Sequence, residues 1–111
     1  MNEIIQKLQS IQDVITTITK LIVAGQNSEA QKLLPNLTQS LGQGILLMIV
    51  SDYIPNDLKQ EERNYWIDQI SRVNEAIEVN DGFRIIDVLY IETMNKLTDY
   101  ITEIKQMVNN E

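Results

Sequence analysis

The residue types that most often perform chemistry in proteins are absent from this chain or scattered along it. The 111 residues include no His and no Cys. This composition excludes Ser-His triads, cysteine nucleophiles and metal sites built on thiolate or imidazole ligands. The serine hydroxyl groups, for example those of Ser10, Ser40 and Ser71, therefore have no histidine base to activate them. The sequence predicts no catalytic residue, no metal site and no cofactor, and we expect the protein not to be an enzyme.

Carboxylates are the remaining reactive groups. Asp and Glu number 16 against 9 Lys and Arg, which gives a net charge of −7. Residues 1–50 carry three acids and three lysines, so the whole excess lies in residues 51–111. This acidic half suggests an alternative function, the binding of a small molecule or a cation. The negative charge also disfavours nucleic acid and anionic membranes as partners.

Apolar residues recur every three or four positions in four segments, which is the spacing of one buried helix face. The segments cover residues 2–24, 28–50, 57–79 and 81–108. Short connections between long helices make consecutive helices antiparallel. The sequence therefore predicts one all-α domain over residues 1–111, an up-down-up-down four-helix bundle.

Turn-forming residues mark the expected helix ends. Gly25 follows the first apolar stripe as a C-terminal cap, and Ser28 with Gln31 has the spacing of a capping box. Pro35 lies inside the second stripe, so either that helix is kinked there or a turn precedes a helix that begins at the proline. The apolar phase is unchanged across Pro35, which favours one kinked helix. The small size of Gly42 and Gly44 would permit close approach of another helix.

The run Ile45–Val50 is apolar at every position. Six apolar residues cover all sides of a helix, and a small bundle buries only part of each helix, so either flanking loops or another chain covers the remainder. The run is too short to cross a bilayer, and residues 1–5 do not resemble a signal peptide, so we expect a soluble, cytoplasmic protein. The candidate partner-binding residues are four in the run and two aromatic anchors: Leu46, Leu47, Ile49, Val50, Tyr53 and Trp66.

The last segment contains two possible buried stripes. One begins Phe83, Asp87, Tyr90 and Met94, and it would bury the carboxylate of Asp87. The other, Ile86, Leu89, Thr93, Leu97, Tyr100 and Ile104, leaves Asp87 at the solvated edge of the core. Asp87 and Glu92 are the candidate buried polar residues, because a buried charge requires hydrogen-bond or ionic partners.

Two short stretches carry a resemblance to a family. Residues 80–92 resemble a segment of an uncharacterised family of small acidic helical proteins from Gram-positive bacteria: Asp87, Leu89 and Glu92 match its pattern, and Val88, Tyr90 and Ile91 depart from it. The piece 32–37 is similar to that family's Leu-Leu-Pro-Asp-Leu helix. The resemblance implies a helical fold and no known activity.

Two functional interpretations follow from these observations. The first is a protein-protein interaction module without enzymatic activity: a homodimer, an adaptor or a chaperone-like bundle that binds another helix in an apolar groove. Bacterial export chaperones are bundles of similar class and length, an analogy of fold alone. The alternative is the ligand-binding or cation-binding module that uses the acidic half.

Overall fold

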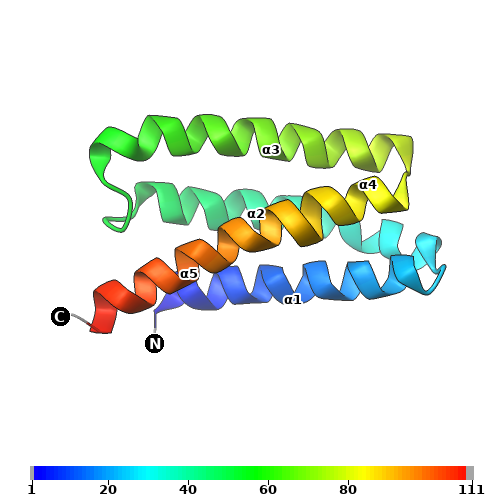
Figure 1. Ribbon diagram of the computed structural model, residues 1–111, viewed down its shortest axis with the longest axis horizontal. Coiled ribbons are helices and arrows are strands. Elements are labelled where there is room, and N and C mark those ends of the chain that lie inside the picture. The colour runs from blue at the N-terminus through cyan, green and yellow to red at the C-terminus, as the bar shows by residue number, and fades with distance from the viewer. Residues whose placement is uncertain (1, 110–111) are drawn as a thin grey trace.

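The protein is an all-α, up-down-up-down bundle of four long helical rods (Figure 1). The structure is a computed structural model, and it describes residues 2–109. The first three rods are α1 (Glu3–Val23), α2 (Asn27–Val50) and α3 (Lys59–Val79), with a single 3₁₀ turn, η1 (Asn56–Leu58), before α3. The fourth rod is continuous and has three parts: α4 (Gly82–Ile86), the π-helical segment η2 (Asp87–Thr93) and α5 (Met94–Asn109). The predicted fold class is confirmed.

The fourth rod crosses the front of the bundle diagonally (Figure 1). Its first half, α4 and η2, packs against α3, and α5 packs against α1. Because α5 diverges from α3 along this path, long side chains have to fill the space between those two helices.

The turn between α1 and α2 is a Schellman motif. Gly25 adopts a φ of +77°, its N–H donates to the carbonyl of Ile22 at 3.0 Å, and the N–H of Gln26 donates to that of Leu21 at 2.8 Å. Gly25 therefore ends α1 as predicted. The predicted capping box at Ser28 is wrong, because α2 already begins at Asn27 and no side chain caps its first turn.

Helix α2 continues through Pro35 as one helix. A turn followed by a new helix at the proline is therefore excluded, and a bend of the axis there stays a prediction. Gly44 is buried against α1: a Cβ at this position would lie 2.7 Å from Cδ1 of Ile11. Close approach of α1 and α2 thus depends on Gly44, as its small size indicated, whereas Gly42 lies in open space.

Polar side chains define the remaining helix ends. The Lys59 ammonium group donates to the carbonyl oxygen of Ile49 and, at 2.7 Å, to that of Ser51, which neutralises the negative end of the α2 dipole. Asp81 caps α4 as predicted, since its carboxylate accepts from the N–H groups of Phe83 and Arg84. The third helix was expected to begin at Asp57, but α3 begins at Lys59, after η1.

The prediction of a buried Asp87 is wrong, because its side chain is exposed. In the first half of the fourth rod the buried positions are Ile85, Val88, Leu89 and Thr93, and Phe83 is 85% exposed. The π-helical turn holds more residues than an α-helical turn, so it shifts the apolar phase between α4 and α5. The alternative stripe through Leu89, Thr93 and Leu97 is the one that packs into the core.

Candidate functional site

The outer surface between α2 and α3 carries an apolar groove of about 180 Å³, which we call the α2–α3 groove. Helix α2 contributes one wall and α3 the other, and the side chain of Trp66 closes the floor with 2% exposure. The residues that line it are Gly42, Ile45, Leu46, Ile49, Arg63, Trp66, Ile67 and Ile70. Seven of these eight carry no charge, so the groove is suited to apolar side chains.

Large apolar side chains stand exposed on both walls of the α2–α3 groove. Leu46 on α2 is 61% exposed and Ile67 on α3 is 64% exposed. Val50, one turn beyond Leu46, is 64% exposed. Side chains of this size gain free energy when another surface removes them from water, by roughly 25 cal/mol for each Å² buried.

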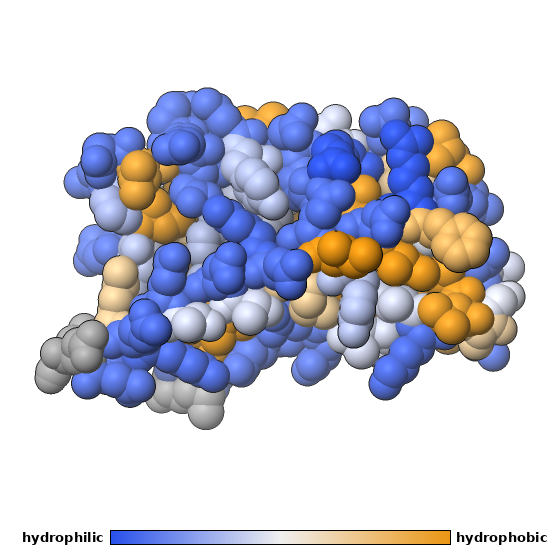
Figure 2. All heavy atoms as spheres, viewed as in Figure 1, coloured by the Kyte–Doolittle hydropathy of each residue, from blue (hydrophilic) through white to orange (hydrophobic). Residues whose placement is uncertain are grey.

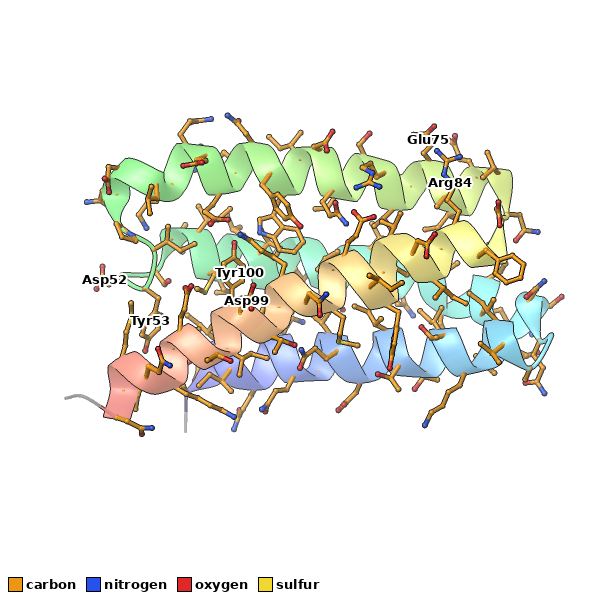
Figure 3. The ribbon with its side chains drawn as sticks, in the orientation of Figure 1. Asp52, Tyr53, Glu75, Arg84, Asp99 and Tyr100 are labelled. Atoms are coloured by element: carbon orange, nitrogen blue, oxygen red, sulfur yellow. The ribbon has the colours of Figure 1, made fainter. Side chains whose placement is uncertain are left out.

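Charge is nearly absent around the α2–α3 groove, although the protein carries −7. No residue of α2 from 33 to 50 is charged, and Arg63 is the one charged residue in the groove lining. The acidic side chains Glu62, Glu75 and Glu92 instead form ion pairs between α3 and the fourth rod. Glu75 and its partner Arg84 are labelled in Figure 3.

The predicted partner-binding residues fall into two groups. Leu46, Ile49 and Trp66 meet in the α2–α3 groove, although Ile49 and Trp66 are buried and present only their edges to it. Leu47 and Val50 are exposed on the last turns of α2 and do not line the groove. Tyr53 lies apart from the groove, in the loop after α2 (Figure 3), where its hydroxyl oxygen accepts a hydrogen bond from the Asn2 side chain at 2.6 Å.

Three residues of the α3 wall, Arg63, Ile67 and Ile70, were missing from the predicted site residues, together with Gly42 and Ile45 on α2. Ile67 was recognisable in principle as an exposed apolar residue. It follows Trp66 directly, so its side chain lies about 100° around the helix from the apolar stripe. Which helix would lie beside it was not encoded in the local spacing, since that depends on how the bundle closes.

A layer of polar and aromatic side chains fills the space between α3 and α5. The indole N–H of Trp66 donates to the hydroxyl of Tyr100 at 2.8 Å, and that hydroxyl donates to Glu62 at 2.7 Å. The Lys96 ammonium group lies 3.1 Å from Glu62 and 4.8 Å from the centre of the Tyr65 ring. Each buried polar atom in this layer therefore has a partner, and the layer fixes α5 relative to α3.

A second polar cluster lies beside the π-helical segment. The Gln69 amide, 2% exposed, donates to the carbonyl of Val88 and to the hydroxyl of Thr93, both at 3.2 Å. Thr93 in turn donates to the Val88 carbonyl at 2.8 Å. Glu92, a predicted buried polar residue, is half-buried and forms a two-pronged ion pair with Arg72. These contacts tie the π-helical segment to α3.

The Tyr100 hydroxyl should make stability depend on alkaline pH. Burial of the phenol, with the nearby Glu62 carboxylate, raises the pKa of Tyr100 above its ordinary value of 10.0. The folded protein therefore keeps this proton at a pH where the unfolded chain has lost it. Its contribution to stability is complete below about pH 10 and declines as the pH rises above that value. We expect wild-type stability to fall more steeply above pH 10 than that of Tyr100→Phe, measured by urea unfolding.

At neutral pH the same variant tests the hydrogen bonds. Tyr100→Phe leaves the buried Trp66 N–H without an acceptor, which costs about 1–3 kcal/mol. The pH prediction is contradicted if the free energies of unfolding of the two proteins differ by the same amount at every pH from 7 to 11. In that case the fold does not hold the Tyr100 proton.

A second apolar surface lies at the opposite end of the bundle from the η1 loop. Figure 2 shows a largely hydrophilic face with an apolar band where α1 ends and the fourth rod begins. A pocket of about 320 Å³ opens there between Ile22, Val23, Gly82, Phe83 and Ile86. Phe83 and Val23 are 85% and 76% exposed. This end pocket has no predicted site residue in its lining.

Two further properties of residues 2–109 bear on the class of site. The described residues contain no group of three or more Asp or Glu side chains arranged to hold a metal ion. One helix, α2, is long and apolar enough to cross a membrane by length and composition alone, a property that core helices of soluble bundles share. In this fold α2 packs against α1 and α3.

No protein-family model matches the chain, and neither a curated protein nor a solved structure matches it significantly.

Proposed function

We propose that the protein is a non-enzymatic, cytoplasmic protein-binding module that uses the α2–α3 groove. The observation that carries this proposal is the pairing of exposed Leu46 and Ile67 across an apolar groove whose lining contains one charged residue, Arg63. Apolar surface rimmed by polar residues is typical of protein-protein contacts in soluble proteins. The groove has the form that binds one apolar helix face, with buried Trp66 as a rigid floor.

The test adds negative charge to both walls of the α2–α3 groove. In the variant Leu46→Glu/Ile67→Glu, carboxylates replace two exposed side chains, so the core is unchanged and far-UV circular dichroism should match the wild type. Binding to any protein, a second copy or another chain, should weaken at least about tenfold, the effect of losing one well-packed contact. Sedimentation over a concentration series measures self-association, and immobilised protein measures capture from a lysate.

Phe83→Glu is the matched control, because it adds a carboxylate at an exposed apolar residue of the end pocket. Association should survive this change. A wild-type protein that stays monomeric and captures nothing contradicts the proposal, and so does association that Phe83→Glu abolishes and Leu46→Glu/Ile67→Glu leaves intact.

A further inference from the structure

The first half of the fourth rod carries large apolar side chains on its exposed sides as well as in the core. Three residues of this half are buried: Ile85, Val88 and Leu89. Each is followed in the sequence by another large apolar or aromatic residue, namely Ile86, Leu89 and Tyr90. A shift of the helix by one residue would therefore exchange one apolar set for another, with Ile in place of Ile, Leu in place of Val and Tyr in place of Leu.

The π-helical segment η2 contains the extra residue that such a shift requires, because a π turn holds more residues than an α turn. If η2 became α-helical while α5 stayed in place, each residue of α4 would move into the place of the residue before it. This movement is a rotation of about 100° and a translation of about 1.5 Å along the axis. The extra residue would enter the turn that connects α3 to α4 (Figure 1). The sequence therefore offers two registers for α4, the π register of the structure and an α register.

The α register would place Phe83 in the end pocket. The side chain of Phe83 would start from the place of Gly82, where an added Cβ lies 2.8 Å from Cγ2 of Ile22. Both Gly82 and Ile22 line the end pocket, whose volume is about 320 Å³. A cavity of roughly 150 Å³ is already large enough to bind benzene, so the pocket has space for the phenyl ring and for a shift of Ile22. Phe83 is 85% exposed in the π register, and its burial would favour the α register.

Polar contacts hold the rod in the π register. The carbonyl oxygen of Val88 accepts hydrogen bonds from Gln69 at 3.2 Å and from Thr93 at 2.8 Å. The Thr93 bond spans five residues, which is the separation of a π turn. The Asp81 carboxylate also caps α4 in this register. A shift to the α register would break these contacts, and it would gain α-helical backbone hydrogen bonds and the burial of Phe83.

We infer that the fourth rod is a two-register switch, in which conversion of η2 from π to α rotates α4 and closes the end pocket with Phe83. The polar contacts make the π register the resting state. A molecule that binds in the open end pocket favours this state, and loss of the Gln69 contact favours the closed one. Closing would also move Arg84 away from Glu75, its ion-pair partner on α3 (Figure 3). The switch does not involve the α2–α3 groove and is independent of the proposed function.

The test places a positive charge at two neighbouring residues whose surroundings in the two registers are opposite. In Ile85→Lys the ammonium group lies in the core in the π register, which is costly, and in the exposed place of Arg84 in the α register. In Ile86→Lys it is half-buried in the π register and enters the core in the α register. Phe83 is the only phenylalanine of the chain, so incorporation of 4-fluorophenylalanine labels one site. The solvent isotope shift of its fluorine resonance between H₂O and D₂O measures the exposure of the ring.

We expect Ile85→Lys to fold with wild-type helicity and to show a solvent isotope shift at least twofold smaller than the wild type, because its Phe83 lies in the end pocket. Ile86→Lys is the matched control and should keep the wild-type shift. Deletion of Ile91 removes the extra residue and leaves residue 85 in the core. The combination of this deletion with Ile85→Lys should therefore lose cooperative unfolding in urea, because no second register remains to expose the lysine.

Three results would overturn the two-register switch. The first is a folded Ile85→Lys whose fluorine is as exposed as in the wild type, because the lysine then reaches solvent from the π register. The second is an Ile85→Lys protein without cooperative unfolding, because no second register then accommodates the charge. The third is a combined variant that is as stable as Ile85→Lys alone, because tolerance of the lysine then does not need the extra residue of η2.

Discussion

Deletion of Ile91 should leave the bundle folded, whereas deletion of Asp99 should unfold it. Both residues are exposed and both lie in the fourth rod. In the wild type the buried positions Ile85, Leu89, Thr93 and Leu97 are spaced 4, 4 and 4, which a straight α-helix does not hold on one face. Deletion of Ile91 changes this spacing to 4, 3 and 4, the pattern of a continuous α-helix. The π segment then becomes α-helical without rotating either end.

Deletion of Asp99 has no such compensation. It rotates the chain after Thr98 by about 100° and moves the buried Tyr100, Ile101 and Ile104 away from the core. Losing a large core side chain costs about 2–5 kcal/mol, so three together exceed most of the roughly 5–15 kcal/mol that stabilises a domain. Far-UV circular dichroism and urea unfolding measure both variants. If both deletion variants lose cooperative unfolding to the same extent, the π segment does not arise from one extra residue in an α-helix.

Gly44→Leu should destabilise the protein by about 3 kcal/mol, near the upper end of the range for overpacking a core. The new side chain would have to displace the buried Ile11 and separate α1 from α2. Gly42→Leu is the matched control on the same helix: it gains about 1 kcal/mol of helix propensity and meets no neighbour at its Cβ. The two are compared by urea unfolding at a protein concentration low enough to keep Gly42→Leu and the wild type monomeric. If the Gly42→Leu monomer is also destabilised, the proposed difference between Gly44, which packs against α1, and Gly42, which meets no neighbour, is wrong.

The fold was predictable because the first three helices carry an unbroken apolar phase. The stripe through Leu8, Ile11, Ile15 and Ile18 is the buried face of α1, and the ends at Gly25 and Asp81 follow from local hydrogen bonding that the residue types specify. The capping box at Ser28 failed because the Schellman turn already places the chain in helical geometry at Asn27. Local geometry from the preceding turn outweighed a side-chain cap.

The error at Asp87 has one physical cause. An apolar stripe was extended from Met94 back to Phe83 at the α-helical repeat, across a segment that is π-helical. One extra residue per turn rotates the earlier positions, so Phe83 and Asp87 lie in solvent and Ile85 lies in the core. The sequence contained a sign of the π segment. The buried positions Ile85, Leu89, Thr93 and Leu97 are each four residues apart, and one of them, Thr93, is polar.

The candidate site was predictable on α2 and not on α3. The apolar run indicated an exposed surface at Leu46 and Val50, because no bundle of this size buries every side of a helix. Its partner wall at Ile67 depends on which helices become neighbours. The position of Trp66 on the apolar stripe favoured the core over an exposed anchor, and the structure buries it with Tyr100 of α5 as its hydrogen-bond acceptor.

The same run also governs what happens when the bundle opens. Ile45–Val50 combines β-branched and other large apolar residues without charge, proline or glycine, the composition of segments that stack into intermolecular β-sheet. In the native state its backbone is held in α2 and half of its side chains face the core. Heat unfolding releases that backbone, so we expect unfolded chains to aggregate through this segment faster than they refold. Thermal denaturation should then be irreversible, with an apparent midpoint that depends on the scan rate.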